Sequence, residues 1–255
     1  LDLALTQVFP QYGVHLSSYN KAIRQRNALL KQLKERGGDP DQLAYWDEKM
    51  TITGAEIIHA RIQALNELET QAAAIHHDLT RGKEILRLRY QPAYEPLPLP
   101  PGQYELPLED RIDRSGLDLK TIQDGLREKL LELRGEEINR GVTTIGPHRD
   151  EIRFLGNGID LGIYGSRGQI RTALLGLKMA EVVWMKAKTG HWPVLLLDEI
   201  LAELDEMRRQ DLLERLVQVE QVLLTTTDLD LFTRHFIQAS KQWSIKEGRL
   251  LKEGV

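Results

Sequence analysis

Two adjacent carboxylates follow a run of four apolar residues in the second half of the chain. The run is Val194–Leu197, and Asp198 and Glu199 come directly after it. In an open α/β sheet, ligands bind beyond the carboxyl ends of the strands, so both acids would lie where a ligand is bound. There Asp198 could help to hold Mg²⁺, and Glu199 could orient or deprotonate an attacking water. A buried strand followed by a solvated acidic turn explains the same residues equally well.

A candidate anion site precedes an expected helix. The segment Ser166–Gln169 reads Ser-Arg-Gly-Gln and stands immediately before a helix that we expect from Ile170. The free N–H groups and the partial positive charge of a helix N-terminus attract anions, and Gly168 would let a phosphate approach closely. An ordinary capped helix start is the plainer interpretation of the same residues.

A basic segment lies near the N-terminus. Between Lys21 and Arg36 the only acid is Glu35. Such a helix could neutralise DNA backbone phosphates without reading the bases, although the solvated face of any amphipathic helix has a similar composition. The candidates for DNA contact are Lys21, Arg24, Arg26, Lys31 and Lys34.

Helices are expected to fill the first part of the chain. Apolar residues recur at helical spacing from Tyr19 to Leu33, and Gly37–Pro40 should end that helix. A second such pattern runs from about Leu43 towards Leu79. The two helices are expected to form an antiparallel arm.

The segment after the arm is less regular. Residues Glu84–Tyr90 alternate apolar and charged side chains, which is a weak strand signal. The proline-rich segment Gln91–Pro107 is expected to be a loop or linker. Helical spacing returns over Thr121–Ile138.

After Gly141, short strands and helices alternate, as a layered α/β sheet requires. Asn157 and Gly158 tolerate positive φ, so they predict a hairpin between Glu151–Leu155 and Ile159–Leu161. The other expected elements are a helix over 170–188, a strand over 194–197, a helix over 206–218 and a strand over 221–224. Because these last two strands lack alternation, we expect them to be buried on both faces.

Composition excludes several classes of protein. The absence of cysteine excludes disulfides, thiol catalysis and cysteine-based zinc sites. A formal charge of -4 gives no reason to expect nucleic acid, so any DNA contact needs a local basic face. No apolar run approaches the roughly 20 residues that span a bilayer, so no membrane partner is expected. The start at Leu1 lacks Met and a basic segment, and is expected to be a cut or processed start in a cytoplasmic protein.

The motifs also occur in an informative order. Four segments resemble, in this order, the signature loop, Walker B strand, D-loop and switch segment of ABC ATPases. They are Ser166–Gln169, Asp198–Glu199, Glu203–Asp205 and Thr225–Asp228. These segments also resemble the RecF family, together with three others. One is Ile145–Asp150, which reads Ile-Gly-Pro-His-Arg-Asp, and the other two are Tyr19–Lys21 and Gln25–Leu30 in the first long helix. The resemblance covers nearly the whole chain.

The resemblance implies a role for each site residue. Ser166 and Gly168 would contact the γ-phosphate of ATP that is bound by a second subunit, and Gln169, Asp205 and Thr227 would also bind nucleotide. Asp198 would bind Mg²⁺ and Glu199 would act on water. Asp205 would lie across the subunit interface, and Thr227 would occupy the strand end of the switch segment.

Three features of the sequence depart from the patterns of the RecF family and of ABC ATPases. Glu199 stands where many RecF proteins have Asp, and Thr227–Asp228 lacks the switch histidine of transporter ATPases. The chain also has no Gly-x-x-x-x-Gly-Lys-Ser/Thr loop, which such an ATPase needs to bind phosphates. In RecF this loop lies in the N-terminal part, so the chain is expected to be a fragment that is a poor ATPase by itself.

The fold class that follows is α/β: the C-terminal half of an ABC-type ATPase head over residues 141–255, joined to a mostly helical second lobe over residues 1–140. The resemblance implies a DNA replication and repair protein of the SOS response that binds double-stranded or gapped DNA, forms a homodimer with ATP and Mg²⁺, and loads recombinase with RecO-type and RecR-type partners. The alternatives are another SMC-like or break-repair ATPase fragment and a non-catalytic interaction module.

Overall fold

The computed structural model describes residues 1–97 and 113–251. The chain divides into two compact units, Leu1–Trp184 and Met185–Val255. The sequence predicts another boundary, near Gly141, between a helical lobe and a nucleotide-binding head. That boundary stays a prediction.

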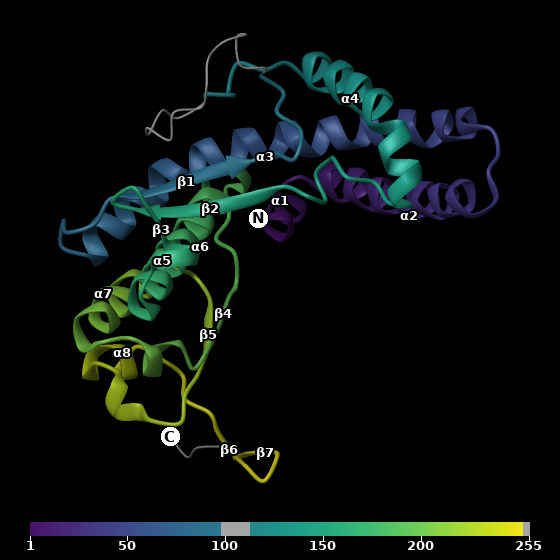
Figure 1. Ribbon diagram of the computed structural model, residues 1–255. Coiled ribbons are helices and arrows are strands. Elements are labelled where there is room, and N and C mark those ends of the chain that lie inside the picture. Colours follow the sequence, from purple (N-terminus) through teal and green to yellow (C-terminus); the bar gives the residue numbers. More distant parts are fainter. Residues whose placement is uncertain (98–112, 252–255) are drawn as a thin grey trace. The chain divides into compact units, whose positions relative to one another are not determined.

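The first unit is built mainly from helices with one small sheet (Figure 1). Its elements are α1 (Asp2–Val8), α2 (Pro10–Arg36), η1 (Pro40–Leu43), α3 (Ala44–Leu79), β1 (Leu86–Gln91), α4 (Leu119–Arg140), β2 (Glu151–Gly156), β3 (Ile159–Asp160), α5 (Leu161–Tyr164) and most of α6 (Arg167–Thr189).

The two long helices α2 and α3 form the predicted antiparallel arm (Figure 1). Gly37 ends α2 with a φ of 71°, a backbone conformation that glycine adopts readily, and the Asp39 side chain caps the turn that follows. Gly54 of α3 lies so close to Tyr19 of α2 that an added Cβ would be 3.2 Å from the tyrosine ring. The expected helix over Thr121–Ile138 is also present, as α4, and it packs against both arm helices.

The small sheet of the first unit has the strand order β1-β2-β3 and is antiparallel. The side chains of β1 alternate, so that Leu86, Leu88 and Tyr90 are buried, which confirms the weak strand signal. The predicted hairpin is confirmed as well, with φ values of 49° at Asn157 and 81° at Gly158 between β2 and β3. Most of the predicted loop over 91–107 lies outside the described residues.

The second unit contains a parallel pair of strands with helices between and after them. Its elements are the end of α6, β4 (Leu195–Asp198), η2 (Ile200–Glu203), α7 (Glu206–Leu216), β5 (Val222–Thr225), η3 (Leu229–Leu231), α8 (Arg234–Gln238), β6 (Ser244–Lys246) and β7 (Arg249–Leu251). Strand β4 pairs with β5 in parallel, as a β-α-β crossover predicts.

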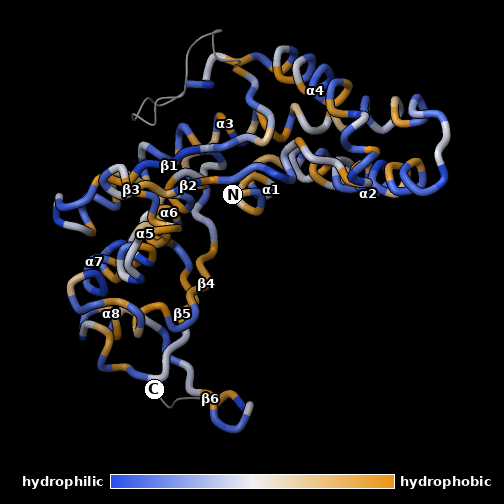
Figure 2. Tube along the Cα trace, in the orientation of Figure 1, coloured by the Kyte–Doolittle hydropathy of each residue, from blue (hydrophilic) through white to orange (hydrophobic). Residues whose placement is uncertain are grey.

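The expectation that β4 and β5 are buried on both faces is wrong. Both strands are apolar (Figure 2), yet their side chains alternate, and Leu196 is 75% exposed. A continuous apolar strand is buried on both faces only where a layer covers each face, and within the described part of the second unit no layer covers the face that carries Leu196.

No helix within the described residues is long and apolar enough to cross a membrane.

Candidate functional site

The carboxyl ends of β4 and β5 bring a carboxylate and a hydroxyl together. Asp198 is the last residue of β4, and its in-register partner is Thr225, the last residue of β5. The Thr225 hydroxyl donates a hydrogen bond to Oδ1 of Asp198, and the Thr225 Oγ1 accepts one from the backbone N–H of Glu199 at 3.1 Å. Parallel pairing therefore fixes both predicted acids at one edge of the sheet.

Glu199 has an unusual backbone conformation. Its φ of 47° and ψ of 21° lie in the left-handed region, which a residue with a side chain adopts at an energetic cost. The residue is exposed, and the short helix η2 begins directly after it. Strained backbone of this kind persists where the surroundings enforce it and often marks functional positions.

Two further predicted residues lie in the same unit, Asp205 between β4 and β5 and Thr227 after β5. Asp205 caps α7, because its Oδ1 accepts a hydrogen bond from the Arg208 N–H at 2.9 Å, and its Oδ2 pairs with the Arg208 guanidinium at 2.9 Å. Thr227 is exposed in the turn after β5, next to Asp228, whose side chain caps η3. Capping accounts for Asp205 structurally and leaves the exposed carboxylate at the surface.

The Ser166 loop, residues Ser166–Gln169, forms a capping box at the start of α6 in the first unit. The Ser166 N–H donates to Oε1 of Gln169 at 3.0 Å, and the Gln169 N–H donates to Oγ of Ser166 at 3.2 Å. An added Cβ at Gly168 would meet its nearest neighbour only at 4.0 Å. The loop is thus fixed by its own side chains while Ser166 and Gly168 stay exposed.

The basic residues of α2 divide into two groups. Lys21, Arg24, Lys31 and Lys34 are exposed. Arg26 is fully buried, where its guanidinium pairs with Asp47 at 2.6 Å and with Glu137 at 2.6 Å. Arg26 is therefore corrected from a DNA-contacting candidate to a core residue.

The helical period could have separated Arg26 from the other cations. With 3.6 residues per turn, Arg26 continues the spacing of the buried Tyr19, Ile23, Leu30 and Leu33 and lies roughly opposite the exposed Lys21, Arg24 and Lys31. The helical period could also have identified Arg61 on α3, because Arg61 follows the spacing of the buried Ile58, Leu65 and Leu68.

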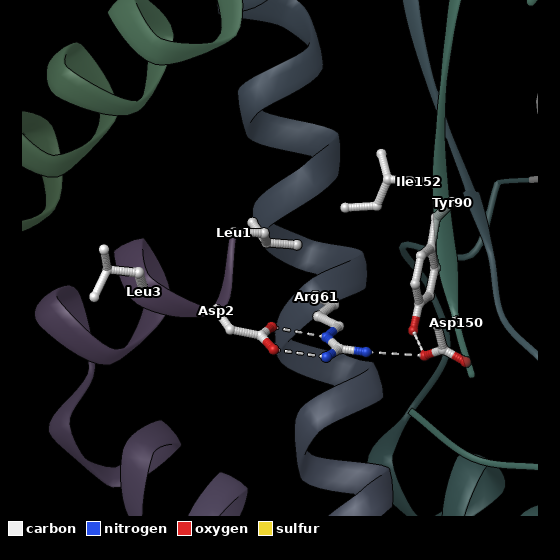
Figure 3. Close-up of a pocket in the computed structure, with 7 residues that line it drawn as sticks. All are labelled: Leu1, Asp2, Leu3, Arg61, Tyr90, Asp150 and Ile152. Atoms are coloured by element: carbon white, nitrogen blue, oxygen red, sulfur yellow. Dashed lines mark hydrogen bonds and ion pairs between the residues drawn. The ribbon is translucent and has the colours of Figure 1, made fainter. Parts of the chain in front are cut away.

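Arg61 explains part of the Ile145–Asp150 motif. Its guanidinium donates two hydrogen bonds to Asp2, at 3.0 and 2.8 Å, and Nη1 donates to Asp150 at 3.2 Å (Figure 3). Nη1 also donates to the Pro147 carbonyl at 2.6 Å. The Tyr90 hydroxyl also donates to Asp150. The motif thus fastens the strand that begins at Glu151 to α3.

His148 from the same motif contacts the arm through Tyr19. Its Nδ1 lies 2.8 Å from the Tyr19 hydroxyl. Loss of solvation on burial, together with the nearby guanidinium groups of Arg149, Arg26 and Arg61, lowers the pKa of His148 from 6.5 to about 4. The imidazole is therefore neutral at pH 7.

None of the protein-family models compared with the chain matches it. The chain is 41% identical over 229 residues to the DNA replication and repair protein RecF of Halothermothrix orenii, a match that covers 89% of this chain and 57% of the relative. It is 37% identical over 253 residues to that of Bacillus subtilis, covering 99% and 64%.

A solved structure gives the same result. The recombination mediator protein RecF with ATP, described as part of the RecFOR pathway, is 28% identical and superimposes with a TM-score of 0.78 over 99% of this chain and 61% of the other. The chain spans about 60% of the length of these relatives. The α/β fold class is that of the C-terminal part of RecF, whose fold is of the ABC ATPase type, and the chain belongs to the RecF family.

Proposed function

We propose that a full-length protein containing this chain is an ATP-dependent, DNA-binding ATPase of the RecF type. One observation carries the proposal: β4 and β5 end in register, so that Asp198, Thr225 and Glu199 lie together at the carboxyl edge of a parallel sheet. This edge is where open α/β folds bind nucleotides.

The residues at this edge suit Mg²⁺. Within the described residues no group of three His, Cys, Asp or Glu side chains could by itself hold a metal ion. Mg²⁺ does not need such a group, because it takes one or two carboxylates together with phosphate oxygens and water. The exposed Asp198 carboxylate supplies a ligand of this type. When bound, the ion would neutralise charge on the phosphates of ATP.

Glu199 is proposed as the residue that acts on water. Its carboxylate follows Asp198 directly, and the hydrogen bond from its N–H to Thr225 fixes its backbone. A carboxylate held beside a metal-bound phosphate can orient a water molecule and accept its proton.

The Ser166 loop is proposed to complete the site of a second subunit. Its exposed serine and glycine lie at the N-terminus of the 23-residue helix α6, whose free N–H groups favour a phosphate. Gln169 is assigned to the same loop, and Asp205 and Thr227, which belong to the second unit, are proposed to bind nucleotide as well. ATP would then drive formation of a homodimer, and hydrolysis would open it.

DNA is proposed to contact the exposed cations of α2. Lys21, Arg24, Lys31 and Lys34 present positive charge that can neutralise phosphates of double-stranded or gapped DNA. The description of the solved RecF structure places that protein in the RecFOR pathway, which supports RecO-type and RecR-type partners and a role in recombinase loading. Such a protein would work in the cytoplasm.

The composite site is tested by Ser166→Arg in the full-length protein. Arginine would place bulk and charge where the proposal puts a γ-phosphate, so ATP should no longer produce a dimer in sedimentation velocity. Lys120→Arg, an exposed position on α4, is the control. Normal dimer formation by Ser166→Arg would contradict the assignment.

A further inference from the structure

The Ser166 loop is fastened to a distant part of the first unit by Glu84. The Gln169 side chain accepts the Ser166 N–H through Oε1 and donates through Nε2 to Oε1 of Glu84 at 3.0 Å. The single amide of Gln169 therefore connects the loop backbone to a carboxylate 85 residues earlier in the sequence.

Glu84 is itself held in place from several directions. The segment around it is pinned by the hairpin residue Asn157, which accepts from the Ile85 N–H at 2.8 Å and donates to the Lys83 carbonyl at 3.2 Å. The second carboxylate oxygen of Glu84 lies 3.6 Å from Nε2 of the fully buried His76. One carboxylate oxygen of Glu84 therefore faces His76, and the other accepts from Gln169.

Helix α6 runs antiparallel to α3, makes two contacts with it, and makes a third with Glu84 in the segment that follows α3. At its C-terminal end the Trp184 indole N–H donates to Glu67 at 2.6 Å, and in its middle Gly176 lies so close to His76 that an added Cβ would be 3.3 Å from the histidine Cβ. Glu84 makes the third contact, at the N-terminal end. Of these three, only the Glu84 contact bears directly on the Ser166 loop.

We propose that Glu84 is a positioning residue for the Ser166 loop. By holding the Gln169 amide, it fixes the orientation of the capping box and so presents the Ser166 hydroxyl and the N-terminal N–H groups of α6 to the γ-phosphate of the second subunit. This inference rests on the proposed function of the loop. Glu84 acts through Gln169 and touches no phosphate.

The test compares three variants of the full-length protein. Glu84→Ala should weaken ATP-driven dimerisation about tenfold, the effect of losing one hydrogen bond to a charged group, while ATP binding by the protomer itself stays unchanged. Glu84→Gln keeps an oxygen that can accept from Gln169 and should restore dimerisation. Glu67→Ala removes a glutamate bond to the far end of α6 and should leave dimerisation unchanged.

Hydrogen exchange separates positioning from phosphate binding. In Glu84→Ala the Ser166 amide should exchange about tenfold faster without ATP, whereas in Glu67→Ala it should not. Unchanged exchange at Ser166, or equal loss of dimerisation in Glu67→Ala, would overturn the positioning role. Faster exchange in Glu84→Ala combined with normal dimerisation by Ser166→Arg would instead show that the loop is positioned but that the proposed function of the loop is wrong, and with it the role assigned to Glu84.

Discussion

Arg26 and Glu137 form an ion pair at 2.6 Å in which neither side chain is exposed to solvent. Arg26 also pairs with Asp47 and donates to the Thr143 hydroxyl at 2.9 Å, so one guanidinium joins α2, α3, α4 and the segment that follows α4. Burying charges costs free energy. The contacts of Arg26 offset this cost only when all of its partners are present. The cluster therefore specifies how the arm helices pack.

The first prediction follows from this cluster. Arg26→Met leaves the carboxylates of Glu137 and Asp47 buried without their main partner, and should lower the free energy of unfolding by about 3–5 kcal/mol. Urea unfolding followed by circular dichroism measures the change. Arg24→Met, an exposed position on the same helix, should change it by less than about 0.5 kcal/mol. Similar losses in both variants would contradict the structural role of Arg26.

A second prediction concerns acid stability and His148. The pKa of His148 is about 4 in the folded protein and returns to about 6.5 on unfolding, so between these values the unfolded chain binds the additional proton. Folding stability should therefore fall as the pH is lowered from about 6.5 to about 4. His148→Gln lacks this contribution and should lose less stability than the wild type between pH 7 and pH 4.5. Parallel stability curves for the two proteins would count against the pKa shift.

The third prediction concerns the basic face of α2. If Lys21 and Lys31 contact DNA phosphates, replacing both with Gln in the full-length protein should weaken binding to all sequences alike. The slope of log K against log salt should also become shallower by about 0.9 for each phosphate that is no longer neutralised. Lys120→Gln with Lys246→Gln removes the same charge from other exposed positions. Fluorescence anisotropy over a salt series measures both, and equal slopes would remove α2 from the DNA-binding surface.

Local sequence signals predicted most elements of the fold. Helical spacing identified α2, α3 and α4, and Gly37 and the Asn157–Gly158 pair marked a helix end and a hairpin with the positive φ values observed. These features depend on residues close together in the sequence, so their pattern can be read directly.

Features that depend on distant residues were not predictable in this way. Arg26 is buried because Asp47 and Glu137 meet it from other helices, and Glu84 reaches Gln169 across 85 residues. Counting the charged residues of α2 does not distinguish Arg26 from the exposed cations. Only its position on the buried face of the helix does. The burial of β4 was overestimated because an apolar strand does not show which layers cover it.

The most direct test of the account is the lifetime of the ATP-bound dimer in a full-length protein carrying Glu199→Gln. Glutamine keeps the shape of the side chain but cannot accept a proton from water, so hydrolysis should slow by at least about a hundredfold. The dimer, followed by sedimentation or by subunit exchange after an excess of unlabelled protein is added, should persist correspondingly longer than that of the wild type. A dimer lifetime and hydrolysis rate equal to those of the wild type would contradict the assignment of Glu199 and of the strand end as the catalytic edge.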